Sequence, residues 1–356
     1  MAKKRSTLPK ELDALLEAGD IEVLKSLFSR CEPNALTSRT YGSNIFSKSP
    51  LPRDFAVWAR EQGADVNFVD YYGKTPIFHQ AGSWRGEVQL LIDLGADVQA
   101  AAGGVTPLHH AAMYGRPKAV KALLDAGADV EARPEEPLFH TRQSPLEMTL
   151  HQNRVPFATL LEVCSLLLEH GARITEDARK AVAAIGEQFE RARPGIQNPE
   201  FLTQQTEALE RLYEIFDVPP AKPVEVHDGV SPIVITEEGF AKQYQKLWDY
   251  LVPPQGRART AQGEAIRIAG RVSHEILDNG GRNWDGDYRK MLRVLPEYFK
   301  LGDPLSGEDL AEVSRLARAL RDGQGNDEPE LLCVYAVKWI LKNPDVLPPF
   351  PADYGR

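Results

Sequence analysis

The sequence lacks the features that mark several large classes of protein. Its 356 residues include only three cysteines, Cys31, Cys164 and Cys333, which are far apart and odd in number. That pattern excludes a disulfide framework and favours reduced thiols in the cytoplasm. No stretch approaches the roughly 18 apolar residues of a membrane span. No apolar run follows the basic start MAKKRSTLPK, so we expect no secretory signal and no membrane partner.

The chain also carries less positive than negative charge, with 42 lysines and arginines against 51 aspartates and glutamates. The formal net charge is −9, whereas a protein that binds the backbone of DNA or RNA needs a basic face. We therefore expect no nucleic-acid partner.

Motifs for catalysis are missing as well. The sequence contains no GxSxG, no GxxxxGK and no GxGxxG, and His274-Glu275 is not followed by the second histidine of a zinc HExxH site. We expect no catalytic residues, no cofactor and no metal.

One polar cluster, residues 278–288, provides the alternative of an enzyme. Asp278, Asp285 and Asp287 could form a divalent-ion or catalytic site, although their spacing does not match an EF-hand loop. An ordinary loop between two helices, with Trp284 as an anchor and Asp285 at a helix start, explains the same residues.

The clearest positive signal lies in residues 104–130, GVTPLHHAAMYGRPKAVKALLDAGADV. Thr106 and Pro107 are typical of the first residues of a helix. Gly115 ends that short helix, and apolar residues at helical spacing then predict a second helix. Gly127, which tolerates a left-handed conformation, ends the second helix.

The same pattern recurs along the chain. Gly-Ala-Asp stands at 63–65, 95–97 and 127–129, in steps of 32 residues, and Gly-Ala-Arg follows at 171–173. A second copy of the helix start, Thr-Pro-Ile-Phe, occupies 75–78. These motifs and a period near 33 resemble the ankyrin-repeat family.

The resemblance covers about residues 8–190 and implies an all-α solenoid of helix-turn-helix repeats joined by hairpin loops. In the family, the histidine at the position of His109 ties neighbouring repeat loops together by hydrogen bonds. Residues 32–54 and 131–143 interrupt the pattern. Such insertions in solenoids often map to the binding face.

We predict three parts. Residues 1–217 form the solenoid with capping helices, residues 218–236 form a proline-rich linker or a short hairpin, and residues 237–356 form an all-helical domain with an extended tail. The helices expected in this last part span about 237–251, 259–279, 286–301, 307–322 and 328–342. We assign this part to no named family.

The residues expected to bind a protein lie on the hairpin tips and first helices, at positions that the repeat pattern does not fix. Aromatic residues, methionine and arginine prevail among them, as in the cores of protein interfaces. The set consists of Phe68, Asp70, Tyr71, Tyr72, Lys74, His79, Trp84, Arg85, His110, Met113, Tyr114, Arg116, Arg133, Glu135, Glu136, Phe139, His140 and Arg142.

The sequence therefore favours a non-enzymatic, cytoplasmic protein that binds another protein. The interpretation we favour is a bacterial inhibitor of the immunity type, which neutralises a cognate toxin or effector. The acidic balance would suit a basic partner. The alternatives are an intracellular ankyrin adaptor or scaffold and, less favoured, an enzyme with a site around residues 278–287. The oligomeric state stays open.

Overall fold

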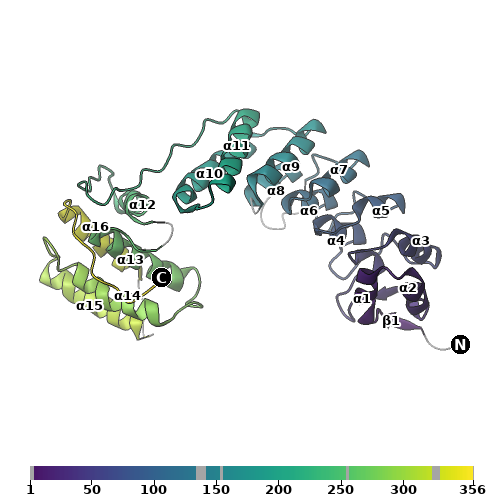
Figure 1. Cartoon of the computed structure of the whole chain (residues 1–356), viewed down its shortest axis with the longest axis horizontal. Helices are drawn as coiled ribbons and strands as arrows, with labels where there is room; N and C mark the ends of the chain where they lie inside the picture. Colours follow the sequence, from purple (N-terminus) through teal and green to yellow (C-terminus); the bar gives the residue numbers. More distant parts are fainter. Residues whose placement is uncertain (1–3, 134–141, 153–154, 254–255, 323–328, 356) are drawn as a thin grey trace. The chain divides into compact units, whose positions relative to one another are not determined.

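A computed structural model describes residues 4–133, 142–152, 155–253, 256–322 and 329–355. It divides the chain into two compact units, Met1–Gly186 with Asn198–Ala221, and Glu187–Gln197 with Lys222–Arg356. Figure 1 follows both units along the chain. None of the helices in the described ranges combines the length and the apolarity needed to cross a bilayer.

The first unit begins with a β-α-α-β segment: β1 Arg5–Thr7, α1 Glu11–Ala18, α2 Ile21–Phe28 and β2 Cys31–Leu36. The two helices belong to the capping helices predicted within residues 1–217. The two strands pair in parallel, which the sequence does not predict, because residues 32–54 show no repeat pattern. Cys31 and Ala35 of β2 are buried, so the start of the insertion is anchored against the first unit.

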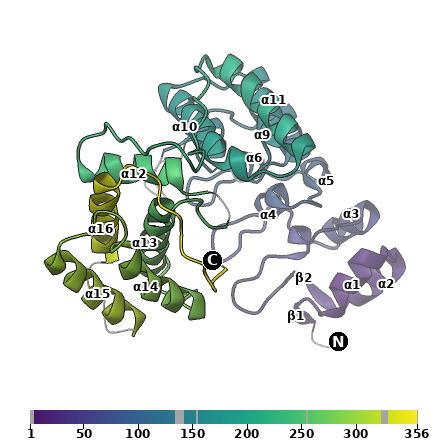
Figure 2. The same ribbon diagram turned by 60° about the vertical axis from the view of Figure 1, so that its left-hand side comes forward.

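The repeats that follow stack in two rows. The inner row consists of η1 Ile45–Ser47, α4 Pro76–Gly82, α6 Pro107–Met113 and α8 Pro145–Gln152. The outer row consists of α3 Arg53–Glu61, α5 Val88–Asp93, α7 Pro117–Asp125 and α9 Phe157–Glu169. Each inner helix from α4 to α8 packs on the next inner helix, and each outer helix from α5 to α9 on the next outer one. Figure 1 shows both rows, and Figure 2 shows α4 and α6 of the inner row from another side. The predicted solenoid is therefore confirmed.

The turn after each outer helix depends on glycine. Gly63, Gly95, Gly127 and Gly171 have φ angles of 93°, 90°, 85° and 95°, a left-handed conformation that costs other residues energy. The repeated glycine in Gly-Ala-Asp and Gly-Ala-Arg is thus the residue that lets the chain leave the outer helix and enter the hairpin.

A row of side chains then joins each hairpin to the next one. The Asn67 amide accepts from Asp97 N (2.8 Å) and donates to Gly95 O (3.1 Å). Gln99, 32 residues on, makes the equivalent bonds to Asp129 N (3.2 Å) and Gly127 O (3.0 Å).

Glu131 occupies the next position of this row and differs in charge. Its carboxylate accepts from Arg173 N (2.8 Å) and pairs with the Arg173 guanidinium at 3.0 Å. Gly-Ala-Arg has replaced Gly-Ala-Asp at this repeat, and a carboxylate has replaced the amide that faces it. We call Asn67, Gln99 and Glu131, with their partners, the hairpin ladder.

Two long helices close the repeats, α10 Glu176–Ala192 and α11 Pro199–Phe216. Helix α11 packs on α9, and Leu209, Leu212 and Phe216 are buried. These are the capping helices that the sequence predicts, because the last repeat of a solenoid would otherwise expose its core.

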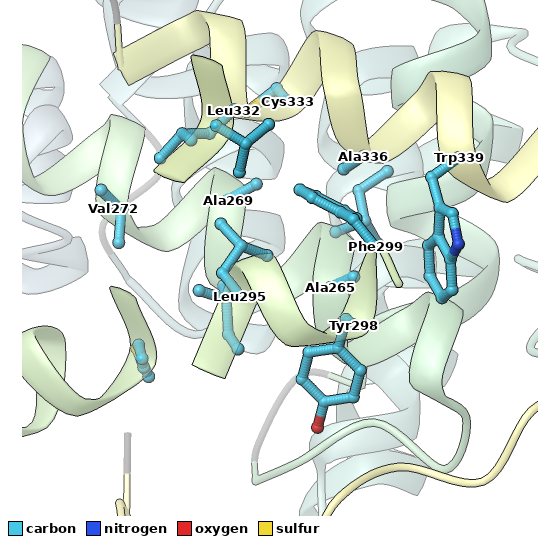
Figure 3. Close-up of a cluster of buried hydrophobic side chains, with 14 of the residues drawn as sticks. Ala265, Ala269, Val272, Leu295, Tyr298, Phe299, Leu332, Cys333, Ala336 and Trp339 are labelled. Atoms are coloured by element: carbon cyan, nitrogen blue, oxygen red, sulfur yellow. The ribbon is translucent and has the colours of Figure 1, made fainter. Parts of the chain in front are cut away.

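The second unit contains the five predicted helices, with ends that differ by up to three residues. They are α12 Phe240–Leu251, α13 Ala261–Leu277, α14 Gly286–Tyr298, α15 Gly307–Arg321 and α16 Pro329–Lys342. Helix α13 lies at the centre and packs on α12, α14 and α16. Figure 3 shows Ala265 and Ala269 of α13 among Leu295, Phe299 and Ala336 in the resulting core.

A buried polar network crosses this core. Glu264 and Arg267, both fully buried, pair through the Nε and Nη2 of the arginine at 2.8 and 2.6 Å. The Tyr354 hydroxyl donates to the same carboxylate at 2.9 Å. Burial alone would raise the pKa of Glu264, but the guanidinium and the hydrogen bonds hold it below its usual value.

The C-terminal tail is part of this unit. It has the extended conformation that its prolines predict, yet it lies against α13: Ala261 N donates to Leu347 O (2.7 Å), and Leu347 N to the Gln262 side chain (3.1 Å). Phe350 N donates to the Tyr298 hydroxyl at 3.2 Å.

Residues 218–236, all of them described, contain no strand, so the hairpin alternative is wrong. Backbone hydrogen bonds run instead from His227 N to Tyr250 O (2.8 Å) and from Ile233 N to Pro344 O (2.7 Å). The proline-rich segment therefore lies along the second unit. The three-part division at residues 217 and 237 stays a prediction.

Candidate protein-binding face

Three exposed tyrosines lie together at the first hairpin tip. Tyr71 and Tyr72 are 72% and 58% exposed, and Tyr41 from the 32–54 insertion is 53% exposed. The Tyr41 ring lies 5.0 Å from Tyr71 and 5.7 Å from Tyr72, and the rings of Tyr71 and Tyr72 are 5.3 Å apart. We call these residues the tyrosine cluster. Tyr41 was missing from the predicted set, because the insertion carries no repeat pattern that would place it.

Asp70 holds the tip from below. Its Oδ1 accepts from Tyr72 N and Lys74 N, both at 2.9 Å, and its Oδ2 lies 2.8 Å from His79 Nε2. The side chain is almost fully buried. We had expected Asp70 to contact a partner; the structure corrects this, because its oxygens already bind the tip and fix the two tyrosines before any partner arrives.

The aromatic surface continues across the inner helices. Lys74 Nζ lies 6.0 Å from the centroid of the Tyr72 ring and 5.4 Å from that of Phe78. The Phe78 ring stacks on His110 at 4.3 Å, and His110 meets Tyr114 edge-on at 4.9 Å. Tyr114 is 42% exposed.

A second aromatic–cation pair lies beyond Tyr114. Trp84 is 81% exposed, so it is not buried between repeats. The Arg116 guanidinium covers its ring at 3.7 Å. Arg116 also donates through Nε to Gly82 O (3.1 Å) and through Nη1 to Tyr114 O. The tyrosine cluster, Phe78, His110, Tyr114 and Trp84, with Lys74 and Arg116, form what we call the aromatic track.

His110 is an uncharged member of the predicted binding residues. Its Nδ1 lies 2.9 Å from Phe78 O, so this nitrogen must carry the proton. Burial is the main cause that lowers the pKa of His110 to about 4. The ring is therefore neutral at pH 7 and belongs to the apolar part of the track.

The first unit should accordingly lose stability as the pH falls. The unfolded chain binds a proton at His110 near pH 6.5 and the folded chain only near pH 4, so stability is full above 6.5 and decreases by about 3 kcal/mol by pH 4. His110→Gln, which keeps a donor for Phe78 O, should remove most of this loss. Urea unfolding of both proteins from pH 7 to pH 4.5 measures it, and equal slopes would contradict the assignment.

Some of the remaining predicted residues already bind other side chains of this protein, and others do not. Arg85 pairs with both Glu17 oxygens at 2.7 and 2.9 Å and so joins α4 to α1. Phe68 and Met113 are half-buried, as is His79, and they carry less of the surface than the tyrosine cluster does.

An ion pair between Arg133 and Glu147 helps to fix the base of the 131–143 insertion. Arg133 binds both oxygens of the buried Glu147 at 2.8 and 3.2 Å and donates to Arg142 O at 2.7 Å. Arg133 therefore closes the loop, and Arg142 remains exposed. The other predicted tip residues, Glu135, Glu136, Phe139 and His140, lie outside the described residues.

Thr106 and His109, two polar residues of the repeat pattern, form the start of α6 and need no partner protein to explain them. His109 is buried, its Nδ1 lies 2.8 Å from Thr106 Oγ1, and its Nε2 lies 3.1 Å from Gln143 O in the next repeat. The bond to Gln143 is the tie between repeats that the resemblance implies for this histidine.

The polar cluster at residues 278–288 is an interhelical loop. Asp285 caps α14 through Asp287 N (3.0 Å), and the Trp284 ring stacks on Tyr288 at 5.1 Å. Asp278 Oδ2 lies 2.7 Å from His274 Nδ1. Throughout the described ranges, no three histidine, cysteine or carboxylate side chains converge to hold a metal.

The comparison with protein families agrees with the repeats. Residues 52–134 match the family model for ankyrin repeats, in three copies. The C-terminal region matches no family model, and no curated protein matches the chain. The matched region runs from α3 to just beyond α7, and it contains the whole aromatic track except Tyr41.

Proposed function

We propose, from the premise that residues 52–134 are ankyrin repeats and thus a protein–protein interaction module, that this chain is a non-enzymatic inhibitor. It binds one cognate protein in the bacterial cytoplasm through the aromatic track and neutralises it, as an immunity-type protein does with a toxin or effector. The observation that carries the proposal is the tyrosine cluster, which is exposed and held in position.

The preformed geometry supports a binding role. Side chains that are already fixed lose little conformational entropy when a partner docks. Asp70 fixes the tip, and Arg116 fixes Trp84 through a stacked guanidinium. Exposed tyrosine, tryptophan and arginine are also the residue types that most often dominate binding energy.

The candidate catalytic side chains are already engaged or buried, which supports inhibition rather than catalysis. The carboxylates at residues 278–287 cap a helix or pair locally, and Cys164 is buried with its pKa raised to about 12, so it is no nucleophile. An inhibitor needs only a rigid surface of the right shape. The expectation of a basic partner rests on the net charge alone. The local charges of the aromatic track, Lys74 and Arg116, are positive and would suit an acidic segment instead.

The experiment begins with the reading frame beside this gene. Its product should arrest growth when expressed alone, growth should return when this chain is co-expressed, and calorimetry should give a one-to-one complex. Tyr72→Ala should weaken binding by about 2 kcal/mol or more, roughly thirtyfold, if Tyr72 is a hot spot. Thermal unfolding should barely change, because the side chain is mostly exposed.

Phe201→Ala is the matched control. Phe201 is an exposed aromatic residue of α11, away from the inner row, and its loss should leave affinity unchanged. Should Tyr72→Ala and Tyr114→Ala bind like wild type while changes in the second unit abolish binding, the repeats would be a scaffold and the second unit would recognise the partner. Binding without neutralisation would favour the adaptor alternative.

A further inference from the structure

Phe78 in the aromatic track replaces the histidine that would pair with the threonine at the helix start. In the 104–130 repeat, the Thr106 hydroxyl is paired with His109 Nδ1 at 2.8 Å. In the preceding repeat the equivalent residues are Thr75 and Phe78, and the buried Thr75 hydroxyl has no hydrogen-bond partner. A buried hydroxyl left unpaired costs about 1–3 kcal/mol.

The Phe78 ring is itself buried, at 4% exposure, and supports the surface from beneath. It supports Lys74 on one side and stacks on His110. A histidine hydrogen-bonded to Thr75 would remove the apolar ring that joins the tyrosine cluster to His110 and Tyr114. Sites where a local rule of folding is broken are those where function is expected, and here the departure places a buried apolar ring beneath Lys74 and His110.

The charges along the track have one sign. The two tip segments, residues 37–43 and 68–74, carry Arg39 and Lys74, and their one carboxylate, Asp70, is buried and engaged. At the other end, Arg116 binds carbonyl oxygens and the Trp84 ring and pairs with no described carboxylate. Lys74 likewise has no ion pair among the described residues. A chain of net charge −9 thus presents cations where its aromatic side chains gather.

We infer that the aromatic track recognises an extended, acidic segment of the partner protein, with apolar side chains between its carboxylates. The inference rests on the proposed function and names the chemistry of its partner. Carboxylates would meet Lys74 and Arg116, and the apolar side chains would pack on the rings between them. A strip that runs from a hairpin tip across successive inner helices fits an extended segment better than a compact knob.

A single-stranded nucleic acid is the other ligand that combines negative charge with stacking. The track offers few cations for a phosphate backbone, and each neutralised phosphate must be matched by a lysine or arginine. An acidic peptide needs only one or two carboxylates at the right places, so we favour it.

The test selects random displayed peptides on the full chain and retains those whose binding Tyr72→Ala removes. The retained peptides should be acidic and contain aromatic or aliphatic residues. One of them, synthesised, should bind about tenfold more weakly to Lys74→Glu and to Arg116→Gln, and its analogue with lysine in place of each carboxylate should not bind. Lys118→Glu, an exposed charge reversal on α7 in the outer row, should bind like wild type.

Three results would overturn the inference: retained peptides that are neutral or basic, no peptide that depends on Tyr72, or displacement of the acidic peptide by oligothymidylate at equal concentration. Failure here is distinct from failure of the proposed function. If Tyr72→Ala still abolishes binding of the natural partner, the face binds protein and only the acidic chemistry is wrong. If that variant binds the natural partner normally, the proposed function itself fails.

Discussion

Replacing Glu264 with alanine is expected to destabilise the second unit by about 3–5 kcal/mol. The carboxylate is fully buried and receives hydrogen bonds from Arg267, from Ala258 N at 3.0 Å and from Tyr354 at 2.9 Å. Its removal takes away the carboxylate that pairs with the fully buried Arg267 guanidinium. The loss is much larger than the value of an exposed ion pair, which is about 0–1 kcal/mol.

The double variant Glu264→Met with Arg267→Met is the control that separates charge from packing. Because both buried charges disappear together, it should recover most of the lost stability. Hydrogen exchange of the α13 amides, followed by mass spectrometry on the full chain, reads the stability of this unit alone. A single variant that exchanges as slowly as wild type would show that Arg267 finds another partner.

Removing residues 344–356 is expected to have the second large effect, a loss of about 5 kcal/mol or more from the second unit. The tail supplies hydrogen-bond partners to the fully buried Gln262 and to the partly buried Arg257. Gln262 Nε2 donates to Asp345 O at 2.7 Å, and Arg257 Nη2 donates to Phe350 O at 2.7 Å. The tail also places Tyr354 against Glu264. Each buried group that loses its partner costs about 1–3 kcal/mol.

Tyr354→Phe gives a graded comparison. It removes one hydroxyl and leaves the rest of the tail, so it should cost about 1–2 kcal/mol. Calorimetric melting of the full chain and the truncated chain measures both effects, and the transition of the repeats should persist. A truncated chain that retains two transitions at unchanged temperatures would mean that the tail only covers the unit without stabilising it.

The helices of both units could be predicted from local signals. Proline, threonine or serine at helix starts and glycine at helix ends define α4, α6 and α8 and the turns between rows. These signals act within a few residues, so a sequence displays them directly. The parallel pair β1–β2 could not be found in this way, because its two strands are more than twenty residues apart and Pro33 lies within one of them.

The binding face was predicted less completely, for a related reason. Tyr71, Tyr72, Tyr114 and Trp84 are exposed as expected, because tips and turns place their side chains outward. Tyr41 was missed because only the folded insertion brings it to the tip. The distinction between open and engaged residues also depends on tertiary contacts.

Arg85 and Arg133 illustrate that distinction. On the sequence they are indistinguishable from Arg116, which pairs with no carboxylate among the described residues. In the fold, Glu17 engages Arg85 and the buried Glu147 engages Arg133. Both partners lie in other helices, at sequence separations of 68 and 14 residues. No local pattern announces such a pairing.

The hairpin ladder has a consequence for how this gene can change in length. Asn67 and Gln99 make interchangeable bonds 32 residues apart, so unequal recombination that duplicated or deleted one such block would leave every amide paired. A deletion that removed Glu131 would place the uncharged Gln99 opposite Arg173, and the ion pair between Glu131 and Arg173 would be lost. Evolution can therefore lengthen or shorten the solenoid on the amino-terminal side of that junction, while the last repeat and its capping helices are inherited as one block.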